Sequence, residues 1–234
     1  MSIEVEPHPE FAGIYFTKLD DGVKRITTKN FSPGRTVYGE RLVTYNGIEY
    51  RIWDPFRSKL AAAILKGIRK MPLGPGQRVL YLGAASGTTA SHVSDIVGKD
   101  GCVYCVEFSP RSIRDLIDNV CKYRSNMIPI LADARSPRSY ASIVLGKIDG
   151  IYCDIAQPEQ ARILLDNVRL FLKKGGWALI AVKARSIDVT KEPVEIYERE
   201  AKILEEGGLR ILEMINLEPY DKAHSMISSY YPLN

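Results

Sequence analysis

The first 55 residues alternate short apolar runs with turn-forming residues, and hardly any helical periodicity is present among them. Asn46-Gly47 divides the last of these runs into two apolar stretches, which is the typical signal of a two-residue hairpin turn. The runs are rich in β-branched and aromatic residues, and they occupy positions 11–19, 23–30 and 41–53. This pattern predicts a small β-rich N-terminal domain over residues 1–55.

From residue 56 the pattern changes to alternating helices and strands. Residues 58–70 repeat apolar side chains at helical spacing, with one face made of Leu60, Ala61, Ile64, Leu65 and Ile68. Further helices are expected at 88–97, 111–123, 158–173 and 194–206. Strands are expected at 78–83, 102–108, 127–133, 149–155, 176–184, 209–217 and 224–231.

The order of these elements predicts the fold class of residues 56–234. The early strands are apolar on both faces, as in a sheet that helices cover on both sides. Alternating strands and helices indicate a doubly wound α/β domain, in which ligands bind at the carboxyl ends of the strands. Only the link EPYDKA joins the last two strands, so we expect the seventh strand to run against the others.

Composition adds broad limits. The chain has 234 residues, 45% of them hydrophobic, which is enough for one domain with a sizeable core or for one with a small appendage. No apolar run reaches the roughly 18 residues of a membrane span, and the N-terminus shows no signal peptide, so we expect a cytoplasmic protein and no membrane partner. The net charge of +4 is compatible with a nucleic-acid partner without requiring one.

The four cysteines raise the question of a zinc site. Cys102 and Cys105 form a C-x-x-C, but they lie inside a predicted strand, where residues three apart point to opposite faces. A second pair of ligands is missing, and the three histidines are scattered along the chain. We therefore expect buried free thiols and no metal.

The stretch LGAASGTT forms a bend of small residues between the first strand of the sheet and the next helix. Its glycines allow a sharp turn and close approach of a ligand, and the free N–H groups of the helix favour a polar or anionic group. The G-x-x-x-G spacing is neither the dinucleotide fingerprint nor a Walker A loop, and a plain tight turn is the alternative. The bend consists of Gly83, Ala84, Ala85, Ser86, Gly87, Thr88 and Thr89.

Carboxylates follow at the ends of the next three strands. Glu107 lies 24 positions after Gly83, where an acid can accept hydrogen bonds from ribose hydroxyls, and Phe108 beside it can pack on an adenine. Asp133 and Asp154 end the third and fourth strands, although such acids can also cap helices. An acidic edge whose loop lacks Lys and Arg suits the sulfonium and ammonium of S-adenosylmethionine better than the pyrophosphate of NAD.

Several stretches resemble fibrillarin in its short archaeal-type form, among them WDPFRSKLAAAILKG, VLYLGAASGTTASHVSDIVG, CDIAQPEQARIL and LEPYDKAHSMI. The resemblance implies a class I S-adenosylmethionine-dependent methyltransferase with a seven-stranded Rossmann-like sheet and an antiparallel last strand. It implies 2′-O-methylation of ribose in rRNA, and in archaea also in tRNA, within a C/D-box guide ribonucleoprotein. The implied partners are the guide RNA, the target RNA, a coiled-coil scaffold protein of the Nop family and, indirectly, a kink-turn-binding ribosomal-type protein.

The chain differs from many other methyltransferases at one position and from the eukaryotic form of the family at its N-terminus. The resemblance also implies a set of catalytic residues. Tyr81 stands where many other methyltransferases have an acid, and the eukaryotic Gly/Arg-rich extension is absent. The family's lysine–aspartate–lysine–histidine set falls on Lys59, Asp154, Lys183 and His224. We expect Lys183 nearest the hydroxyl, either as base or as a cation that stabilises the alkoxide, with Asp154 orienting it.

The cofactor is expected where the strand tips converge. The residues predicted to bind it are Gly83, Ala84, Ala85, Gly87, Thr88, Thr89, Glu107, Phe108, Asp133, Ala134, Asp154, Ile155, Ala156 and Gln157. Basic residues that are expected to contact RNA phosphates are Arg57, Lys59, Lys66, Arg69, Arg111, Arg135, Arg138 and Arg185. Two alternatives stay open at this point, a small-molecule O-methyltransferase and a cofactor-binding scaffold subunit without catalysis.

Overall fold

The computed structural model describes residues 3–233 and contains two β-sheets, one in each part of the chain. The N-terminal sheet is antiparallel, and Asn46 and Gly47 form its β4–β5 hairpin turn with positive φ angles of 49° and 74°, as the pattern predicts. Its spatial order is β1 (Glu4–Pro7), β2 (Ile14–Lys18), β3 (Lys24–Lys29), β5 (Ile48–Ile52) and β4 (Leu42–Tyr45). The polar strand β1 lies outside the apolar runs and was not expected.

The second sheet has seven strands in the order β11-β12-β10-β9-β6-β7-β8. Strand β12 pairs antiparallel with both β10 and β11, which confirms the expected direction of the seventh strand. The strands are β6 (Arg78–Leu82), β7 (Cys102–Glu107), β8 (Met127–Leu131), β9 (Ile148–Cys153), β10 (Leu172–Lys183), β11 (Arg210–Asn216) and β12 (His224–Tyr230).

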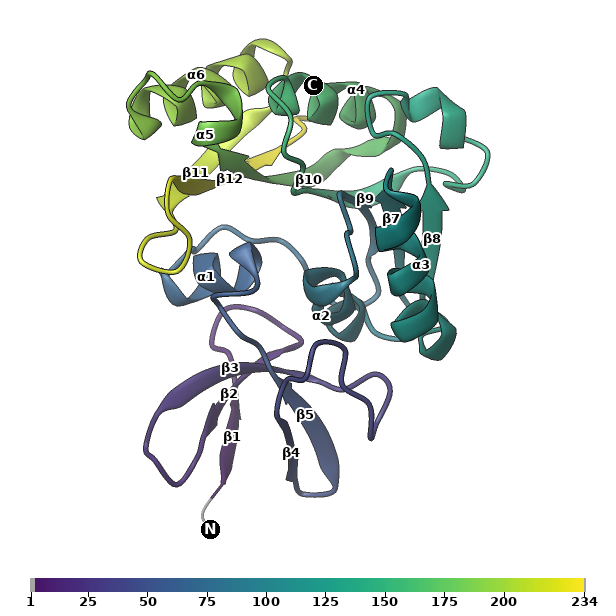
Figure 1. Cartoon of the computed structure of the whole chain (residues 1–234), viewed down its shortest axis with the longest axis vertical. Coiled ribbons are helices and arrows are strands. Elements are labelled where there is room, and N and C mark those ends of the chain that lie inside the picture. Colours follow the sequence, from purple (N-terminus) through teal and green to yellow (C-terminus); the bar gives the residue numbers. More distant parts are fainter. Residues whose placement is uncertain (1–2, 234) are drawn as a thin grey trace.

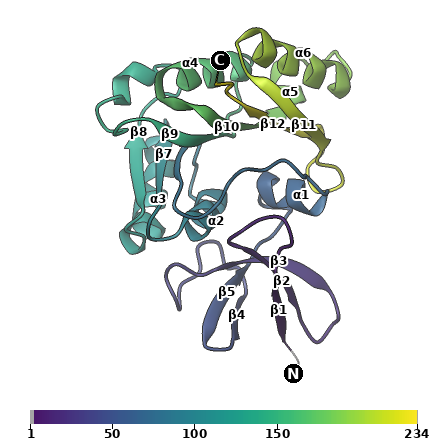
Figure 2. The same ribbon diagram turned by 180° about the vertical axis from the view of Figure 1, so that it is seen from behind.

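Helices cover both faces of this sheet. Figures 1 and 2 show α4 and α6 on one side of the sheet, and α1 and α2 on the other side, between it and the N-terminal sheet. Two apolar cores fill the space, one on each side of the sheet. The helices are α1 (Lys59–Leu65), α2 (Thr88–Val97), α3 (Pro110–Asn119), α4 (Gln160–Phe171), α5 (Ala184–Ile187) and α6 (Pro193–Glu206), with short 3₁₀ turns η1 (Cys121–Tyr123) and η2 (Pro137–Tyr140).

Helix α1 ends earlier than the predicted range of 58–70. Gly67 takes a φ of 85°, and its N–H donates to the Ile64 carbonyl, while Ile68 N–H donates to the Ala63 carbonyl. These two bonds form the left-handed glycine cap that commonly ends a helix. Ile68 stays buried beyond the cap, so the periodicity correctly marked a buried residue that is not helical.

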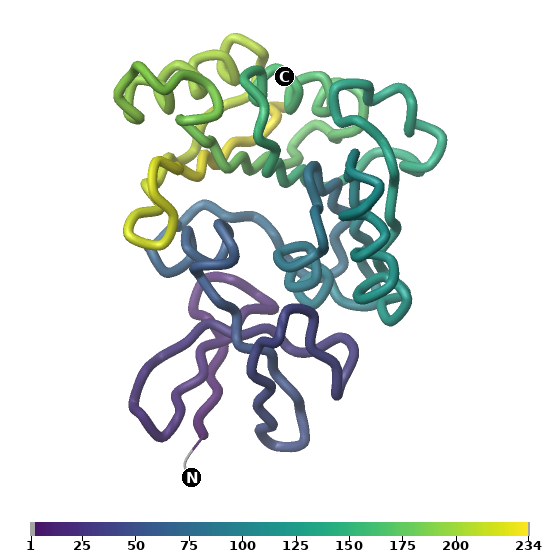
Figure 3. The backbone as a smooth tube through the Cα atoms, viewed as in Figure 1, coloured from purple at the N-terminus to yellow at the C-terminus, as the bar shows by residue number. Residues whose placement is uncertain are grey.

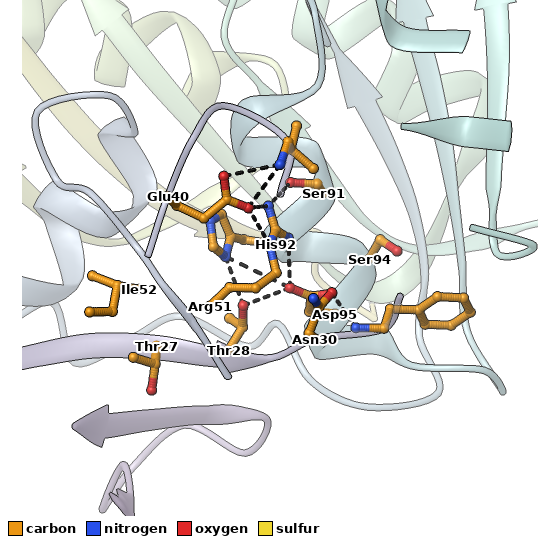
Figure 4. A network of polar contacts seen from close by, with 12 residues as sticks. Thr27, Thr28, Asn30, Glu40, Arg51, Ile52, Ser91, His92, Ser94 and Asp95 are labelled. Atoms are coloured by element: carbon orange, nitrogen blue, oxygen red, sulfur yellow. Dashed lines mark hydrogen bonds and ion pairs between the residues drawn. The ribbon is translucent and has the colours of Figure 1, made fainter. Parts of the chain in front are cut away.

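A buried network of charged and polar groups joins the N-terminal sheet to α2 (Figure 4). Asp95 of α2 accepts from Arg51 Nη1 at 2.8 Å and from Arg124 Nη1 at 2.5 Å, and none of these three side chains is more than 2% exposed. Arg51 also pairs with Glu40 at 2.6 Å and donates to Ser91. Buried charges are tolerated only when paired, so the network fixes the sheet against α2.

His92 is the neutral member of this network. Burial, with the charges of Arg51 and Arg124, lowers the pKa of His92 well below its ordinary range. The Thr28 hydroxyl donates to Asp95 at 2.7 Å, so it accepts from His92 Nδ1, which lies 2.7 Å away. Nε2 is then the acceptor for the Tyr38 hydroxyl at 2.8 Å. One histidine thus bridges the two parts of the chain without carrying charge.

Candidate active site

Strand register brings three of the predicted catalytic residues to one face of the sheet. Asp154 directly follows β9, Lys183 is the last residue of β10, and His224 begins β12 and pairs with Lys183. Side chains two positions apart on a strand share a face. The residues two positions away from these three belong to the core on the α1 side: Tyr152, Ala181 and Met226. Asp154, Lys183 and His224 therefore lie on the face toward α1.

The fourth predicted residue, Lys59, reaches this face from the first turn of α1. Ser58 is the N-cap of α1, accepting from Ala61 N–H at 3.3 Å and from the Thr89 hydroxyl at 2.9 Å. This cap holds the start of the helix against α2. Lys59 Nζ then lies 3.0 Å from Asp154 Oδ1, and both side chains are about three-quarters buried, at 24% and 22% exposure.

This pairing differs from the expected one. Asp154 was predicted to orient Lys183, but the carboxylate is bound by Lys59 instead. Within residues 3–233, Lys183 Nζ has no hydrogen bond or ion pair. Lys183 is half-buried and makes no direct ion pair within residues 3–233, so it is the cation of this cluster that is available to meet an incoming group.

Asp221 joins the cluster although sequence reasoning did not single it out. It lies on the β11–β12 loop, which passes beside α1 (Figure 3), with its carboxylate 2.9 Å from His224 Nδ1 and 3.8 Å from Lys59 Nζ. Burial alone would raise the pKa of Asp221, but the hydrogen bond from His224 and the nearby charges of His224, Lys59 and Lys183 outweigh it and lower the pKa. The only sequence signal is its place in EPYDKAH, three residues before His224.

The contacts of His224 define which of its nitrogens is free. Nδ1 lies 2.9 Å from the Asp221 carboxylate and 2.8 Å from the Lys222 carbonyl, and both of these oxygens are acceptors. Nδ1 therefore carries a hydrogen, and in the neutral ring Nε2 is a bare acceptor. Nε2 is buried and has no hydrogen-bond partner in the described part of the chain. The ring is thus held in the tautomer that can accept a proton.

A pocket of about 280 Å³ opens at the strand tips next to Asp154. The predicted cofactor residues that line it are Gly83, Ala85, Glu107, Phe108, Asp133, Ala134, Asp154, Ile155, Ala156 and Gln157. Sequence reasoning did not assign Val106, Ala132, Arg135 and Ile163 to it. Val106 and Ala132 directly precede predicted residues, whereas nothing in the sequence links Ile163 of α4 to this pocket.

Four predicted cofactor residues do not line the pocket, namely Ala84, Gly87, Thr88 and Thr89. Gly87 is the N-cap of α2 with a φ of 95°, and a Cβ there would lie 2.6 Å from a Leu116 methyl group. The Thr89 hydroxyl is used by Ser58, and Ala84 is buried. These residues shape the bend and its packing, and the open side of the bend belongs to Gly83 and Ala85.

The chemistry of the lining fits an adenosyl group. Both oxygens of the Glu107 carboxylate are fixed, one by Ala85 N–H at 2.9 Å and the other by Ser109 N–H at 2.8 Å, which leaves lone pairs for further donors such as ribose hydroxyls. The Phe108 side chain is 68% exposed at the pocket, so its ring is available for stacking. A Cβ on Gly83 would lie 2.4 Å from the Asp154 carbonyl oxygen, so only glycine allows this close approach.

The negative charge of Asp133 is balanced by a neighbouring arginine. The carboxylate forms an ion pair with Arg135 at 2.6 Å, and the hydrogen bond from Arg135 lowers the pKa of the Asp133 carboxyl. Arg135, which was expected to contact RNA, is thus a lining residue of this pocket. The uncompensated acid of the pocket is Glu107, since Asp154 is paired with Lys59.

Comparison with known proteins decides the family. The sequence model of fibrillarin matches residues 5–233. The chain belongs to the fibrillarin family. A relative from Sulfolobus acidocaldarius, named fibrillarin-like rRNA/tRNA 2′-O-methyltransferase, is 56% identical over 98% of each chain. The crystal structure of Aeropyrum pernix fibrillarin with natively bound S-adenosyl-L-methionine is 53% identical, with a TM-score of 0.91 over 97% of this chain and 99% of that one.

Two further solved structures are similar to the chain, one of a complex within the family and one of a distant methyltransferase. A crystal structure of a fibrillarin/Nop5p complex is 44% identical, with a TM-score of 0.83 over 94% of this chain and 98% of the other. An S-adenosylmethionine-dependent methyltransferase from Aquifex aeolicus, 17% identical with a TM-score of 0.54 over 76% of this chain and 89% of that one, shares the fold alone. The predicted class I methyltransferase fold of this chain is confirmed.

Other expectations concern metals and membranes. Within residues 3–233, no cluster of His, Cys, Asp and Glu could hold a metal ion, and Cys102, Cys105, Cys121 and Cys153 are free thiols. No helix in the same range is long and apolar enough to span a membrane.

Proposed function

We propose that this chain transfers methyl groups from S-adenosylmethionine to ribose 2′-hydroxyls of rRNA and tRNA, as the catalytic subunit of a C/D-box guide ribonucleoprotein in the cytoplasm. One observation carries the proposal: a lysine without an ion pair and an Asp–His pair converge beside a pocket whose lining fits an adenosyl group. Relatives that carry the rRNA/tRNA 2′-O-methyltransferase name over nearly the full chain support the substrate class.

The residues present fit the cofactor. Glu107 would hold its ribose hydroxyls, Phe108 would pack on its adenine, and the Gly83 bend would admit its chain. When bound, S-adenosylmethionine supplies an electrophilic methyl group on a sulfonium. Because Asp154 ends the strand beside this pocket, the catalytic cluster begins where the pocket ends.

Two groups of the chain then act on the acceptor hydroxyl. The 2′-oxygen loses its proton as its bond to the methyl carbon forms, and His224 Nε2 is placed in the tautomer that accepts this proton. Lys183, which has no ion pair within residues 3–233, stabilises the negative charge that develops on the oxygen. Lys59 pairs with Asp154, so the Asp154 carboxylate is not available to pair with Lys183.

The partners come to the proposal from the family. The fibrillarin/Nop5p complex supports a scaffold protein of the Nop family. A guide RNA would select the nucleotide by base pairing, and a kink-turn-binding ribosomal-type protein would anchor that guide. This division of labour suits a chain whose net charge of +4 gives sequence-independent affinity for phosphates.

Substitution of Lys183 tests the proposal. In a reconstituted particle, Lys183→Ala is expected to abolish transfer of labelled methyl from the cofactor to RNA, while calorimetry shows unchanged cofactor binding. Lys183→Arg keeps the positive charge but cannot act as a base. Measurable transfer by this variant is expected if Lys183 acts as a cation, and no transfer if it acts as the base. The third arm is His224→Ala, which is expected to slow methyl transfer while cofactor binding stays unchanged. Full transfer by Lys183→Ala would contradict the assigned site.

A further inference from the structure

A buried amide on α4 lies next to the cofactor pocket. Asn167 is 0% exposed, and its neighbours on the helix, Leu164, Val168 and Phe171, belong to the apolar core on this side of the sheet. An amide in an apolar core is unfavourable unless its hydrogen bonds are made, and a leucine of similar size carries no such requirement. Packing alone therefore does not account for an asparagine at this position.

Both polar atoms of this amide have partners. Asn167 Nδ2 donates to the Ile163 carbonyl at 2.9 Å, one turn earlier in the same helix, and to the Ala134 carbonyl at 2.9 Å, in the segment after β8. Asn167 Oδ1 accepts from the Tyr140 hydroxyl of η2. The bond to Ile163 fixes the orientation of the amide, and the other two bonds join α4 to the chain between β8 and β9.

The two residues whose carbonyls this amide binds both line the cofactor pocket. Ala134 lies 33 positions before Asn167, and Ile163 is the lining residue that no sequence pattern linked to the pocket. Because both carbonyl oxygens contact the same nitrogen atom, Asn167 brings Ala134 and Ile163 together in one wall of the pocket.

Strand order places this wall at one end of the pocket. Asp154 follows β9, Gly83 follows β6 and Glu107 ends β7, whereas Ala134 comes after β8 at the edge of the sheet. In the proposed function the sulfonium lies beside Asp154 and the ribose hydroxyls lie at Glu107. The wall of Ala134 and Ile163 is therefore at the adenine end of the cofactor.

We infer that Asn167 is a positioning residue for the cofactor, which fixes the adenine end of the pocket through the Ala134 and Ile163 carbonyls. Tyr140 in turn holds the Asn167 amide. A wall that is already in place lowers the cost of ordering the pocket when the cofactor binds, so loss of Asn167 weakens binding rather than slowing the chemical step. The inference rests on the proposed function for the placement of the cofactor, but it involves no RNA.

Calorimetry of the full chain with S-adenosylmethionine tests the inference. Asn167→Leu is expected to raise the Kd about tenfold, close to the contribution of one hydrogen bond. In the reconstituted particle, the KM for the cofactor is expected to rise by the same factor, with kcat at saturating cofactor unchanged. The affinity for 5′-methylthioadenosine, which keeps the adenine and ribose but lacks the amino-acid part, is expected to fall equally.

Asn126 provides a matched control outside the pocket. Its buried amide accepts from the Ser94 hydroxyl at 2.7 Å and donates to the carbonyls of Ser94 and Gly98 at 2.9 and 2.8 Å. Asn126→Leu is expected to lose similar stability in urea unfolding and to leave the Kd for the cofactor unchanged.

A milder pair of variants removes only the donating hydroxyl at each amide. Tyr140→Phe is expected to weaken cofactor binding about threefold, whereas Ser94→Ala leaves it unchanged. Both keep the asparagine, so this pair decides the question if the leucine variants do not fold.

Several results would overturn the inference. These are an unchanged Kd in Asn167→Leu, an equal loss of affinity in Asn126→Leu, or a fall in kcat without a change in KM. Weaker binding of S-adenosylmethionine with unchanged binding of 5′-methylthioadenosine would also contradict it, because the effect would then lie at the sulfonium end. Failure of the proposed function is a separate result, since absence of methyl transfer to RNA by the unaltered particle leaves the calorimetric comparison intact.

Discussion

Replacement of Asp95 by Asn tests whether the buried network fixes the N-terminal sheet to α2. Asp95 accepts four hydrogen bonds, from Thr28, Phe31 N–H, Arg51 and Arg124, at 2.5–2.9 Å. Asn offers only one acceptor oxygen, and its amide would face donors that have lost their acceptor. It also removes one of two carboxylates, with Glu40 left to balance two buried guanidinium groups.

The magnitude follows from burial. Removing one partner of a buried ion pair costs about 3–5 kcal/mol, because the charge left behind has no water around it. Asp95 and Arg51 are 0% exposed in their side chains, so this range applies in full. For a chain of this size, each kcal/mol lowers the melting temperature by roughly 2–4 °C, so Asp95→Asn is expected to melt about 6–20 °C lower.

Urea unfolding followed by tryptophan fluorescence measures this loss. Trp53 stacks on His92 inside the network, with 4.6 Å between the ring centroids, so its emission reports on the network itself. Asp118→Asn is the matched control, because Asp118 pairs with Lys122 at the surface with 49% and 56% exposure, and its loss costs at most about 1 kcal/mol. If Asp95→Asn changed the free energy of unfolding by less than about 1 kcal/mol, the network would not be what fixes the N-terminal sheet to α2.

Three further predictions concern the site and the thiols. Gly83→Ala is expected to abolish cofactor binding in calorimetry, because a Cβ at a φ of 83° would lie 2.4 Å from the Asp154 carbonyl oxygen, whereas Gly74→Ala, with open space around it, is expected to bind normally. Ser58→Ala removes the cap of α1 and is expected to lower the free energy of unfolding in urea by about 1 kcal/mol. Because the cap positions Lys59, the variant is also expected to transfer methyl groups more slowly. Equal transfer rates would argue against the cap's role. Burial raises the pKa of Cys121 to about 11, so the thiol is neutral at pH 8. Alkylation by iodoacetamide is therefore expected to be slow at pH 8 and to accelerate as the pH rises toward 11. Rapid labelling of the folded chain at pH 8 would contradict this.

The order and type of elements could be predicted because each strand and helix of the α/β part carries its own hydrophobic pattern. Helix α2, for example, was expected at 88–97 and begins and ends at those residues. The end of α1 depended on the cap at Gly67, since the apolar repeat continues past it to Ile68. Strand β1 was missed because it is polar and has no fully buried side chain.

The sequence predicts the part of the site that lies at the ends of strands, and not the pairing between residues on distant elements. Asp154, Lys183 and His224 end or begin neighbouring strands, so topology alone brings them together. The partner of Asp154 lies 95 residues away on another element, and no local pattern distinguishes Lys59 from Lys183 in this role. Likewise, the polar side chains of α2 suggest an exposed face. Asp95 is buried because Arg51 of the N-terminal sheet and Arg124 after η1 both pair with it.

A crystal structure of the chain with S-adenosylmethionine bound tests the proposed site most directly. We predict that the adenosyl group lies in the pocket of Gly83, Glu107 and Phe108, with its ribose hydroxyls donating to Glu107 and its sulfur next to the Asp154 end. We also predict that Lys183 Nζ points toward the methyl carbon. An adenosyl group bound elsewhere, or a Lys183 ammonium directed away from the sulfur, would contradict the proposed catalytic site.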